Sequence, residues 1–172
     1  MVNIQELIGK VCPEAVFEEN EITMAVVPDA KWHATAEALK NAGFDCLAAV
    51  VGVDWGEEMG CMYYLKSTAD NTMISVKVAT ADRENPMLHS VADLWAVANL
   101  EEREVYDFFG IKFINHPDMR RLFLRNDWVG YPLRKDYDEN PELNPVRLYH
   151  EEIDDTTTVY KEKDGKVVAE KH

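Results

Sequence analysis

The chain contains little cysteine and no cysteine pair at metal-binding spacing. Only three of its 172 residues are cysteine, Cys12, Cys46 and Cys61, and no two of them form a CxxC motif. Iron-sulfur clusters and structural zinc sites use closely spaced cysteines. An odd number in a chain expected in the cytoplasm also argues against a disulfide framework. We therefore interpret the cysteines as small buried apolar residues and expect no cofactor in this chain.

Glycine-rich phosphate loops and membrane-length apolar runs are missing as well. The eight glycines form neither a GxGxxG motif nor a phosphate loop, so nothing indicates a bound nucleotide. The longest apolar run is Leu47–Val53, whereas a membrane helix needs roughly 20 residues. The amino end, MVNIQELIGKVCPE, has neither the order of a secretory signal nor the composition of a transit peptide. We expect a cytoplasmic chain that does not itself cross a membrane.

Basic residues are outnumbered, with 18 lysines and arginines against 32 aspartates and glutamates and a net charge of -14. This charge disfavours non-specific binding to nucleic acid or to anionic lipid. One stretch differs: residues 112–135, here called the basic segment, hold six basic and two acidic residues. Residues 1–111 hold seven against nineteen, and residues 136–172 hold five against eleven.

The basic segment admits three interpretations. Arginine pairs well with carboxylates, so the segment could bind an acidic partner surface or fold back on the chain's own acids, such as Glu102 and Glu104. A solvated charged strip is the third interpretation. The aromatic and aliphatic residues within the segment argue against it, because they require burial somewhere; they are Phe113, Leu122, Phe123, Trp128 and Tyr131.

Periodicity and turn signals predict an α+β fold, an α/β sandwich in which helices pack on a mixed sheet. Capping residues place helices at 3–10, from Asp29 to Gly43, from Ser90 to about Ala98, and from Leu100 to Phe109. In the last of these, Asn99 and Glu102 are predicted to form a capping box, and Gly110 to end the helix. Strands are expected as a pair within 15–27 and singly at 46–54, 61–67 and 73–80.

Two parts of the chain are expected to differ in character. Residues 1–137 form the predicted domain, and residues 138–172 form an extended acidic C-terminal arm that begins with a proline-broken polar stretch. The arm should not pack into the core. Its scattered apolar residues suit contacts with partner subunits, although a solvated tail is an equal alternative after residue 160.

Four polar side chains invite an enzymatic interpretation. Glu102, Glu104, Asp107 and His116 could bind a metal or perform acid-base catalysis. Spacing weakens this hypothesis, because Glu102 and Glu104 lie about 200° apart around a helix and face different sides. Nearby arginines are equally good partners for these acids. A stand-alone metal-dependent enzyme is therefore a remote alternative.

A longer pattern within 99–137 resembles the signature of the 30 kDa subunit of proton-pumping NADH:quinone oxidoreductase (respiratory complex I). It consists of Glu102-Arg103-Glu104, Asp107-Phe108-Phe109, His116, Arg120, Asp127-Trp128, Gly130 and the run from Pro132 to Tyr137. More than a dozen positions in fixed register make the match specific, and a weaker correspondence extends back to about residue 30. The chain departs from the family pattern at Leu100, Asn115 and Met119.

The resemblance implies a non-catalytic subunit in the hydrophilic arm, peripheral on the cytoplasmic face of the membrane, that serves assembly and alignment. Its expected partners are the large quinone-pocket subunit and the small iron-sulfur subunits, which with other subunits hold the iron-sulfur clusters, FMN and quinone. An equivalent subunit of a membrane-bound [NiFe] hydrogenase is the nearer alternative. The residues we expect at the subunit interface are Glu102, Arg103, Glu104, His116, Arg120, Arg121, Asp127, Trp128, Arg134 and Lys135.

Overall fold

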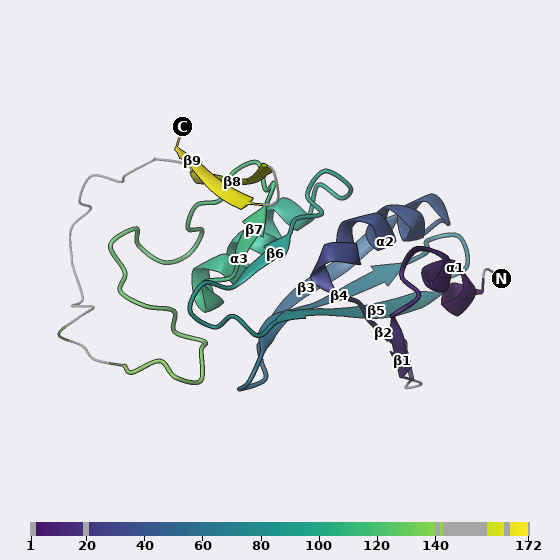
Figure 1. Cartoon of the computed structure of the whole chain (residues 1–172), viewed down its shortest axis with the longest axis horizontal. Helices are drawn as coiled ribbons and strands as arrows, with labels where there is room; N and C mark the ends of the chain where they lie inside the picture. Colours follow the sequence, from purple (N-terminus) through teal and green to yellow (C-terminus); the bar gives the residue numbers. More distant parts are fainter. Residues whose placement is uncertain (1–2, 19–20, 140–141, 143–157, 164–165, 172) are drawn as a thin grey trace.

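The computed structural model describes residues 3–18, 21–139, 142, 158–163 and 166–171 (Figure 1). Within the described part, no helix is long and apolar enough to cross a membrane. The elements, in chain order, are α1 (Ile4–Val11), β1 (Val16–Glu18), β2 (Thr23–Val26), α2 (Asp29–Asn41), β3 (Cys46–Asp54), β4 (Met59–Lys66), β5 (Met73–Thr80), β6 (Met87–His89), α3 (Ala98–Phe109), β7 (Lys112–Ile114), β8 (Thr158–Lys163) and β9 (Lys166–Lys171).

A five-stranded mixed sheet forms the larger half of the fold, in the order β1-β2-β5-β4-β3. β3, β4 and β5 form an antiparallel meander, and β2 pairs with β5 in parallel. The predicted bounds of β3 and β5 are confirmed, and β4 begins two residues before its predicted start. The two predicted strands within 15–27 are confirmed as well; the turn predicted at 19–20 lies outside the described residues.

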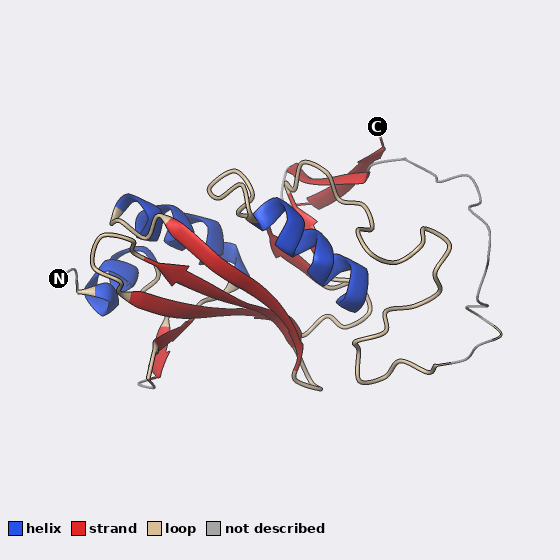
Figure 2. Ribbon diagram, turned by 180° about the vertical axis from the view of Figure 1, so that it is seen from behind, coloured by secondary structure: helices blue, strands red, loops and turns tan. Residues whose placement is uncertain are grey.

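Helices α1 and α2 lie on one face of this sheet (Figures 1 and 2). Trp32 of α2 packs on Tyr63 of β4 with ring centroids 4.3 Å apart, and both side chains are fully buried. The helix ends in a Schellman motif, since Phe44 N–H donates to Leu39 C=O and Gly43, at φ 102°, donates to Lys40 C=O. The sequence therefore marked the end of α2 correctly.

The predicted cap at the start of α2 is wrong. Asp29 is the first helical residue and makes no cap; the preceding Pro28 occupies the cap position. The Asp29 carboxylate instead accepts hydrogen bonds from His89 of β6, from the backbone N–H at 2.7 Å and from Nδ1 at 2.8 Å. Asp29, which has the residue type of a helix cap, thus forms a contact between α2 and the second sheet.

Helix α3 packs on β3, on the same face as α2. Gly52 of β3 lies directly under Phe109 and Val105 of α3, and a Cβ atom at Gly52 would come within 2.6 Å of the Phe109 ring. Gly52 pairs with Cys61, and Cys61 shares a face of β4 with Tyr63 because alternate residues of a strand point the same way. Glycine therefore lets the helix approach the sheet closely.

A second sheet completes the fold, in the order β6-β7-β8-β9. β6 and β7 pair in parallel, β8 adds to β7 in parallel, and β8 and β9 form an antiparallel hairpin. The expectation that no part of residues 138–172 packs into the core is wrong for β8, where Val159 is 7% exposed and Tyr160 packs against the core cluster. The domain boundary at residue 137 stays a prediction, and residues 143–157 lie outside the described part.

The helix predicted from Ser90 to Ala98 is not formed. Residues 92–94 make a turn in which Ser90 Oγ accepts from Ala92 N–H, and regular helix begins only at Ala98. The capping box at Asn99 is wrong for the same reason, because Asn99 already lies inside α3. The predicted end is confirmed: Gly110 adopts the left-handed conformation at φ 71°. A Cβ atom there would also overlap the Tyr131 ring.

Candidate functional site

The residues singled out by the sequence lie on α3 and on the irregular segment that follows β7. Residues 115–139, here called the 115–139 loop, contain turns and one isolated bridge between Met119 and Thr158 but no helix or strand. The loop reaches away from both sheets (Figure 1). It begins at Asn115, whose φ of 65° is in the left-handed region that asparagine tolerates better than most residues. An irregular segment of this length requires specific contacts to hold it.

Asp107 of α3 provides the first contact. Its side chain is fully buried, and Oδ2 accepts from three successive backbone N–H groups, those of Leu122 at 3.1 Å, Phe123 at 2.6 Å and Leu124 at 2.8 Å. Oδ1 accepts from Arg121 Nη1 at 2.9 Å. One carboxylate therefore fixes the backbone of the apolar triplet in the middle of the loop, with its charge balanced by Arg121.

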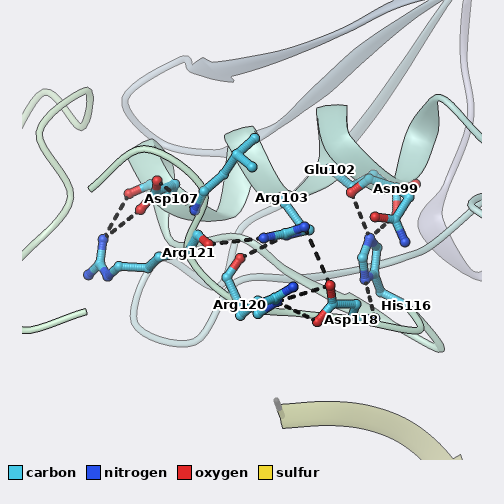
Figure 3. A network of polar contacts seen from close by, with 9 residues as sticks. Asn99, Glu102, Arg103, Asp107, His116, Asp118, Arg120 and Arg121 are labelled. Carbon is cyan, nitrogen blue, oxygen red and sulfur yellow. Dashed lines mark hydrogen bonds and ion pairs between the residues drawn. The ribbon is translucent and has the colours of Figure 1, made fainter. Parts of the chain in front are cut away.

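Arg103 of α3 provides the second contact (Figure 3). Its guanidinium donates to the carbonyls of Arg120 at 3.1 Å and Arg121 at 3.0 Å, and it pairs with the Asp118 carboxylate at 3.4 Å. Arg121 in turn donates to the Trp128 carbonyl at 3.1 Å. These two guanidinium groups thus bind carbonyls and carboxylates of the same chain, which favours folding back over binding an acidic partner for both side chains.

Glu102 and His116 form the buried end of the network. His116 is fully buried; its Nδ1 accepts from Asp118 N–H at 3.0 Å, so Nε2 carries the proton and donates to the Asn99 carbonyl at 3.0 Å. Burial lowers the pKa of His116, which keeps the ring neutral. Glu102 accepts from Ser90 Oγ at 2.6 Å and Val91 N–H at 2.9 Å, and burial raises its pKa to about 8.

The far end of the loop is clamped to the end of β3. Arg83 donates to both Asp54 oxygens, at 2.6 and 2.9 Å, and pairs with Asp136 at 3.2 Å. Asp54 also accepts from Lys135 N–H at 3.0 Å. The Arg83 guanidinium holds the pKa of Asp54 well below its ordinary value. Arg134 donates to the Phe109 carbonyl at 2.6 Å, so both sheet and helix hold this end.

The structure therefore divides the ten predicted interface residues. Glu102 and His116 are fully buried and Arg103 is 7% exposed, so these three side chains contact mainly their own chain. Arg121, Trp128 and Arg134 are half-buried. The exposed members are Glu104, Arg120, Asp127 and Lys135.

Sequence reasoning missed the two residues that hold the far end of the loop, Asp54 and Arg83. Asp54 is not among the predicted site residues, although an acid at the end of a buried strand is a signal that could have been followed. Nothing local in the sequence identifies Arg83 as its partner. Among apolar residues, Phe123 is 63% exposed, Leu133 54% and Val129 48%. Of these three, only Phe123 was predicted to require burial, and within this chain it is not buried.

The acids that could have formed a catalytic or metal site lie apart in the structure. Glu102 bonds to the turn at Ser90, Asp107 bonds to the loop, and Glu104 is exposed, so these acids do not converge. In the described ranges, no group of three histidine, cysteine, aspartate or glutamate side chains could hold a metal ion. What the geometry provides instead is a fixed, irregular, partly apolar surface.

A sequence model of the family described as "Respiratory-chain NADH dehydrogenase, 30 Kd subunit" matches residues 25–142, which extend from β2 through the 115–139 loop. The fused C/D subunit of NADH-quinone oxidoreductase from Phocaeicola vulgatus is 50% identical over 145 residues, covering 83% of this chain and 28% of that protein. The C subunit of the same enzyme from Moorella thermoacetica is 38% identical over 138 residues, covering 78% of this chain and 92% of the relative. The chain thus spans about a quarter of the length of the C/D relatives.

Two solved structures share the fold. One is titled "Nqo5 of the trypsin-resistant fragment (1-134)"; it has a TM-score of 0.60 and 33% identity, covering 67% of this chain and 95% of that one. The other belongs to the membrane-bound sulfane sulfur reductase, an archaeal respiratory membrane complex, with a TM-score of 0.70 and 25% identity, covering 88% of this chain and 95% of that one.

Proposed function

Because this chain belongs to the respiratory-chain NADH dehydrogenase 30 Kd subunit family, we propose that it is a non-catalytic peripheral-arm subunit of a proton-translocating NADH:quinone oxidoreductase. The observation that carries the proposal is the family match over residues 25–142, since this range includes the five-stranded sheet from β2 onward and the whole 115–139 loop. In this role the chain transfers no electron. It binds neighbouring subunits and fixes how they are placed.

The rigidity of the loop supports a role in alignment. Electron transfer slows steeply with distance, so a subunit without cofactors matters if it holds the redox centres of its neighbours at fixed separation. A buried carboxylate, Asp107, and a buried guanidinium, Arg103, fix the backbone of the loop from one helix. Asp54 and Arg83 fix its far end from the sheet. A loop that is held in place by these contacts can in turn fix the position of a neighbouring subunit.

The proposed partners are the large quinone-pocket subunit and the small iron-sulfur subunits of the same complex. The relatives named C/D support the first of these, because the region that matches this chain is only 28% of the Phocaeicola vulgatus protein. Fusion in one chain keeps the two parts at high effective concentration, which favours their association. Iron-sulfur clusters, FMN and quinone would then reside in partner subunits, and this chain would lie peripherally on the cytoplasmic face of the membrane through them.

The interface residues that we retain in this proposal are the exposed ones. Arg120, Asp127 and Lys135 lie on the loop, and Glu104 lies on the exposed side of α3. The half-buried residues behind them and the buried residues that hold the loop in place complete the predicted set; they are Arg121, Trp128 and Arg134, and Glu102, Arg103 and His116.

A second candidate function comes from the archaeal neighbour. The membrane-bound sulfane sulfur reductase chain covers 88% of this chain, more than the Nqo5 fragment does, at a TM-score of 0.70. This likeness favours a corresponding subunit in another membrane-bound respiratory complex, the membrane-bound hydrogenases included. The electron-accepting partner distinguishes the two functions, because the large subunit of a hydrogenase has paired CxxC motifs for nickel and iron.

The test is to tag the carboxyl end, solubilise native membranes in mild detergent and identify the co-purifying chains by mass spectrometry. Recovery with a quinone-pocket subunit, iron-sulfur subunits and antiporter-like membrane subunits is the expected result. Nickel-ligand cysteines in the large partner would shift the function to the second candidate. Recovery of the chain alone, as a soluble monomer, would overturn both.

A matched pair of variants tests the interface within this experiment. Arg120→Ala removes an exposed guanidinium of the loop and should reduce the recovery of partner subunits. Lys10→Ala removes a cation on α1 whose side chain is 70% exposed and should leave recovery unchanged. Arg121 is less suitable, because its loss would also free the buried Asp107 carboxylate.

A further inference from the structure

The 115–139 loop presents a small apolar surface centred on Phe123. The Phe123 ring is 63% exposed and stacks on Phe108 of α3 with ring centroids 5.8 Å apart and 18° between the planes. Leu133 is 54% exposed, and its backbone N–H donates to the Phe108 carbonyl at 3.1 Å. Two different parts of the loop thus contact Phe108, Phe123 through its ring and Leu133 through its backbone.

This surface is held in its exposed position rather than left there by a flexible tip. Phe123 N–H donates at 2.6 Å to the buried Asp107 carboxylate, and its two neighbours in the chain donate to the same oxygen. Single exposed apolar residues are common on protein surfaces. Here a buried charged network fixes the backbone of the exposed ring, which removes most of the conformational entropy that ordering a loop on binding would otherwise cost.

The charge around this surface indicates what kind of partner it fits. The basic segment, residues 112–135, includes both Phe123 and Leu133 and holds six basic against two acidic residues, whereas the remainder of the chain is strongly acidic. Arg121 of this segment pairs with Asp107, but Arg120 and Lys135 are exposed. An acidic protein surface is therefore attracted to these exposed cations and repelled by the acidic remainder of the chain, which both steers association and fixes its orientation. Nucleic acid is disfavoured by the overall charge of -14.

We propose that Phe123, stacked on Phe108, anchors a docking surface for a partner subunit whose facing surface is acidic and has an apolar pocket for the phenyl ring. This proposal rests on the proposed function, because it names the contact through which the subunit is recognised. Aromatic anchors that enter a pocket dominate the affinity of many interfaces, and their truncation to alanine weakens binding about 30-fold or more.

The experiment compares three tagged full-length chains expressed in native cells: wild type, Phe123→Ala and the control Val16→Ala. Val16 is 59% exposed but lies on β1, at the edge of the five-stranded sheet and far from the loop in sequence. The ratio of co-purified partner chains to tagged chain is measured by mass spectrometry across a series of salt washes. We expect the wild-type and Val16→Ala chains to retain their partners, and Phe123→Ala to lose them by about 30-fold or more.

Thermal unfolding of each purified chain separates folding from binding. Leu133→Ala is a second variant of the same surface and should weaken recovery in the same direction. Lys135→Glu, which reverses an exposed charge of the basic segment, should lower the salt concentration at which partners are washed off. A wild-type chain that recovers partners while Phe123→Ala and Leu133→Ala recover them equally well would overturn this inference alone. A wild-type chain that recovers no partner would overturn the proposed function as well.

Discussion

At the scale of single residues, the Glu102 carboxyl group shows how one side chain can hold a turn that is distant in the sequence. Ser90 and Val91 lie eleven or twelve residues before it, yet they donate hydrogen bonds to its side chain at 2.6 and 2.9 Å. Ser90 starts a turn, not the predicted helix, and the carboxyl group that holds this turn comes from α3.

The first prediction concerns Glu102. Replacing it with alanine should lower the free energy of unfolding by about 2–4 kcal/mol, because Ser90 and Val91 lose their buried acceptor and a cavity remains. Glu102→Gln keeps the shape and a carbonyl acceptor, and it should cost less. Denaturant unfolding of both purified variants at pH 6 measures the difference. Equal losses would contradict the prediction, because they would show that the volume and the carbonyl acceptor kept by glutamine do not stabilise the fold.

The contribution of Glu102 to the free energy of unfolding also depends on pH. Burial raises the pKa of Glu102 to about 8, from an ordinary value of 4.5. The unfolded chain releases this proton near pH 4.5 and the folded chain near pH 8, so burying Glu102 costs stability increasingly as pH rises between these values. Unfolding free energies at pH 5 and pH 8 should therefore differ less in Glu102→Gln than in the wild type. A larger difference in the variant would contradict the protonated, buried state.

His89 also makes stability fall as pH rises, but here because a stabilising contact is lost. Its ring lies between Asp29 of α2, at 2.8 Å, and Glu162 of β8, at 3.3 Å, and the hydrogen bond to Asp29 is the main cause that raises its pKa to about 8. A neutral imidazole can donate to only one of the two carboxylates, whereas the protonated ring donates to both. The protonated ring therefore ties β8 to α2 through β6.

The stability that protonated His89 contributes is thus fully present below pH 6.5 and is lost as pH rises through about 8. We expect amide hydrogen exchange in β8 and β9, corrected for its intrinsic pH dependence, to become faster over this range. In His89→Gln that pH dependence should vanish, whereas His33→Gln, which removes an exposed histidine paired with Asp93, should keep it. A wild-type hairpin with unchanged protection from about pH 6 to pH 9 would refute the expectation.

At the scale of elements, a helix or strand was predicted well where the residues that determine it lie within its own stretch of the sequence. β3 and β5 are long apolar strands bounded by turns, and their predicted bounds were correct. β6 and β7 are three residues long and exist because they pair with each other across 25 residues of chain. No local periodicity marks such strands, so they were missed.

The predicted start of α3, at Leu100, was wrong for a related reason. Asn99 is a good capping residue, but Ala98 N–H already donates to Trp95 C=O and Leu100 N–H to Val97 C=O. Successive turns therefore lead directly into the helix, and no side chain is needed as a cap. The turns themselves are fixed by contacts from α2, since His33 pairs with Asp93 and Lys40 donates to the Leu94 carbonyl. Tertiary contacts overrode a local signal.

The candidate site was also only partly predictable, because contacts from distant parts of the chain determine its structure. The sequence drew attention to residues 99–137, because their charged and aromatic residues are unusual, and it allowed for arginines folding back on the chain's own acids. It could not show that Arg103 and His116 would be buried or that Phe123 would be exposed. Those outcomes depend on Asp107 and Asp54, which reach the loop from α3 and β3. Residue type alone does not reveal such distant anchors.

The close approach of α3 to β3 gives a prediction at this scale. Gly52→Ala should lower the free energy of unfolding by about 1–3 kcal/mol, because a methyl group would overlap the Phe109 ring and displace the helix. Gly9→Ala is the matched control: it lies within α1 with nothing inside 4 Å of a Cβ atom. It should stabilise the chain by about 0.5–1 kcal/mol through helix propensity. Both values come from denaturant unfolding.

Asp107 gives a further prediction about an element, the 115–139 loop. Asp107→Asn places an amide where Leu122, Phe123 and Leu124 direct their N–H groups, and removes the charge that Arg121 balances. We expect trypsin to cleave the variant within the loop, after its arginines, about tenfold faster than it cleaves the wild type, because local opening becomes more frequent. Asp45→Asn, which loses exposed bonds to Thr68, should leave these rates unchanged. Equal cleavage of all three proteins would show that the loop is not held by Asp107.

At the scale of the whole molecule, the C-terminal hairpin decides whether the chain is one folded unit or a domain with a free arm. β8 adds to the edge of β7, Val159 is 7% exposed and Tyr160 packs against the core. His89 joins the hairpin to β6 through Glu162, at 3.3 Å. An open strand edge invites pairing with other chains, so the hairpin also protects the second sheet.

Val159→Asp tests this organisation directly. If β8 is part of the core, burying an unpaired carboxylate should lower the free energy of unfolding by about 2–4 kcal/mol, which corresponds to a fall of roughly 5–10 °C in Tm for a chain of this size. Val168→Asp is the control, because Val168 lies on β9 and is 43% exposed; it should change Tm by less than about 2 °C. An arm that only lies on partner subunits would make the two variants of the isolated chain equally stable, since neither valine would then be buried. The comparison therefore decides between the packed hairpin of the structure and the extended arm expected from composition.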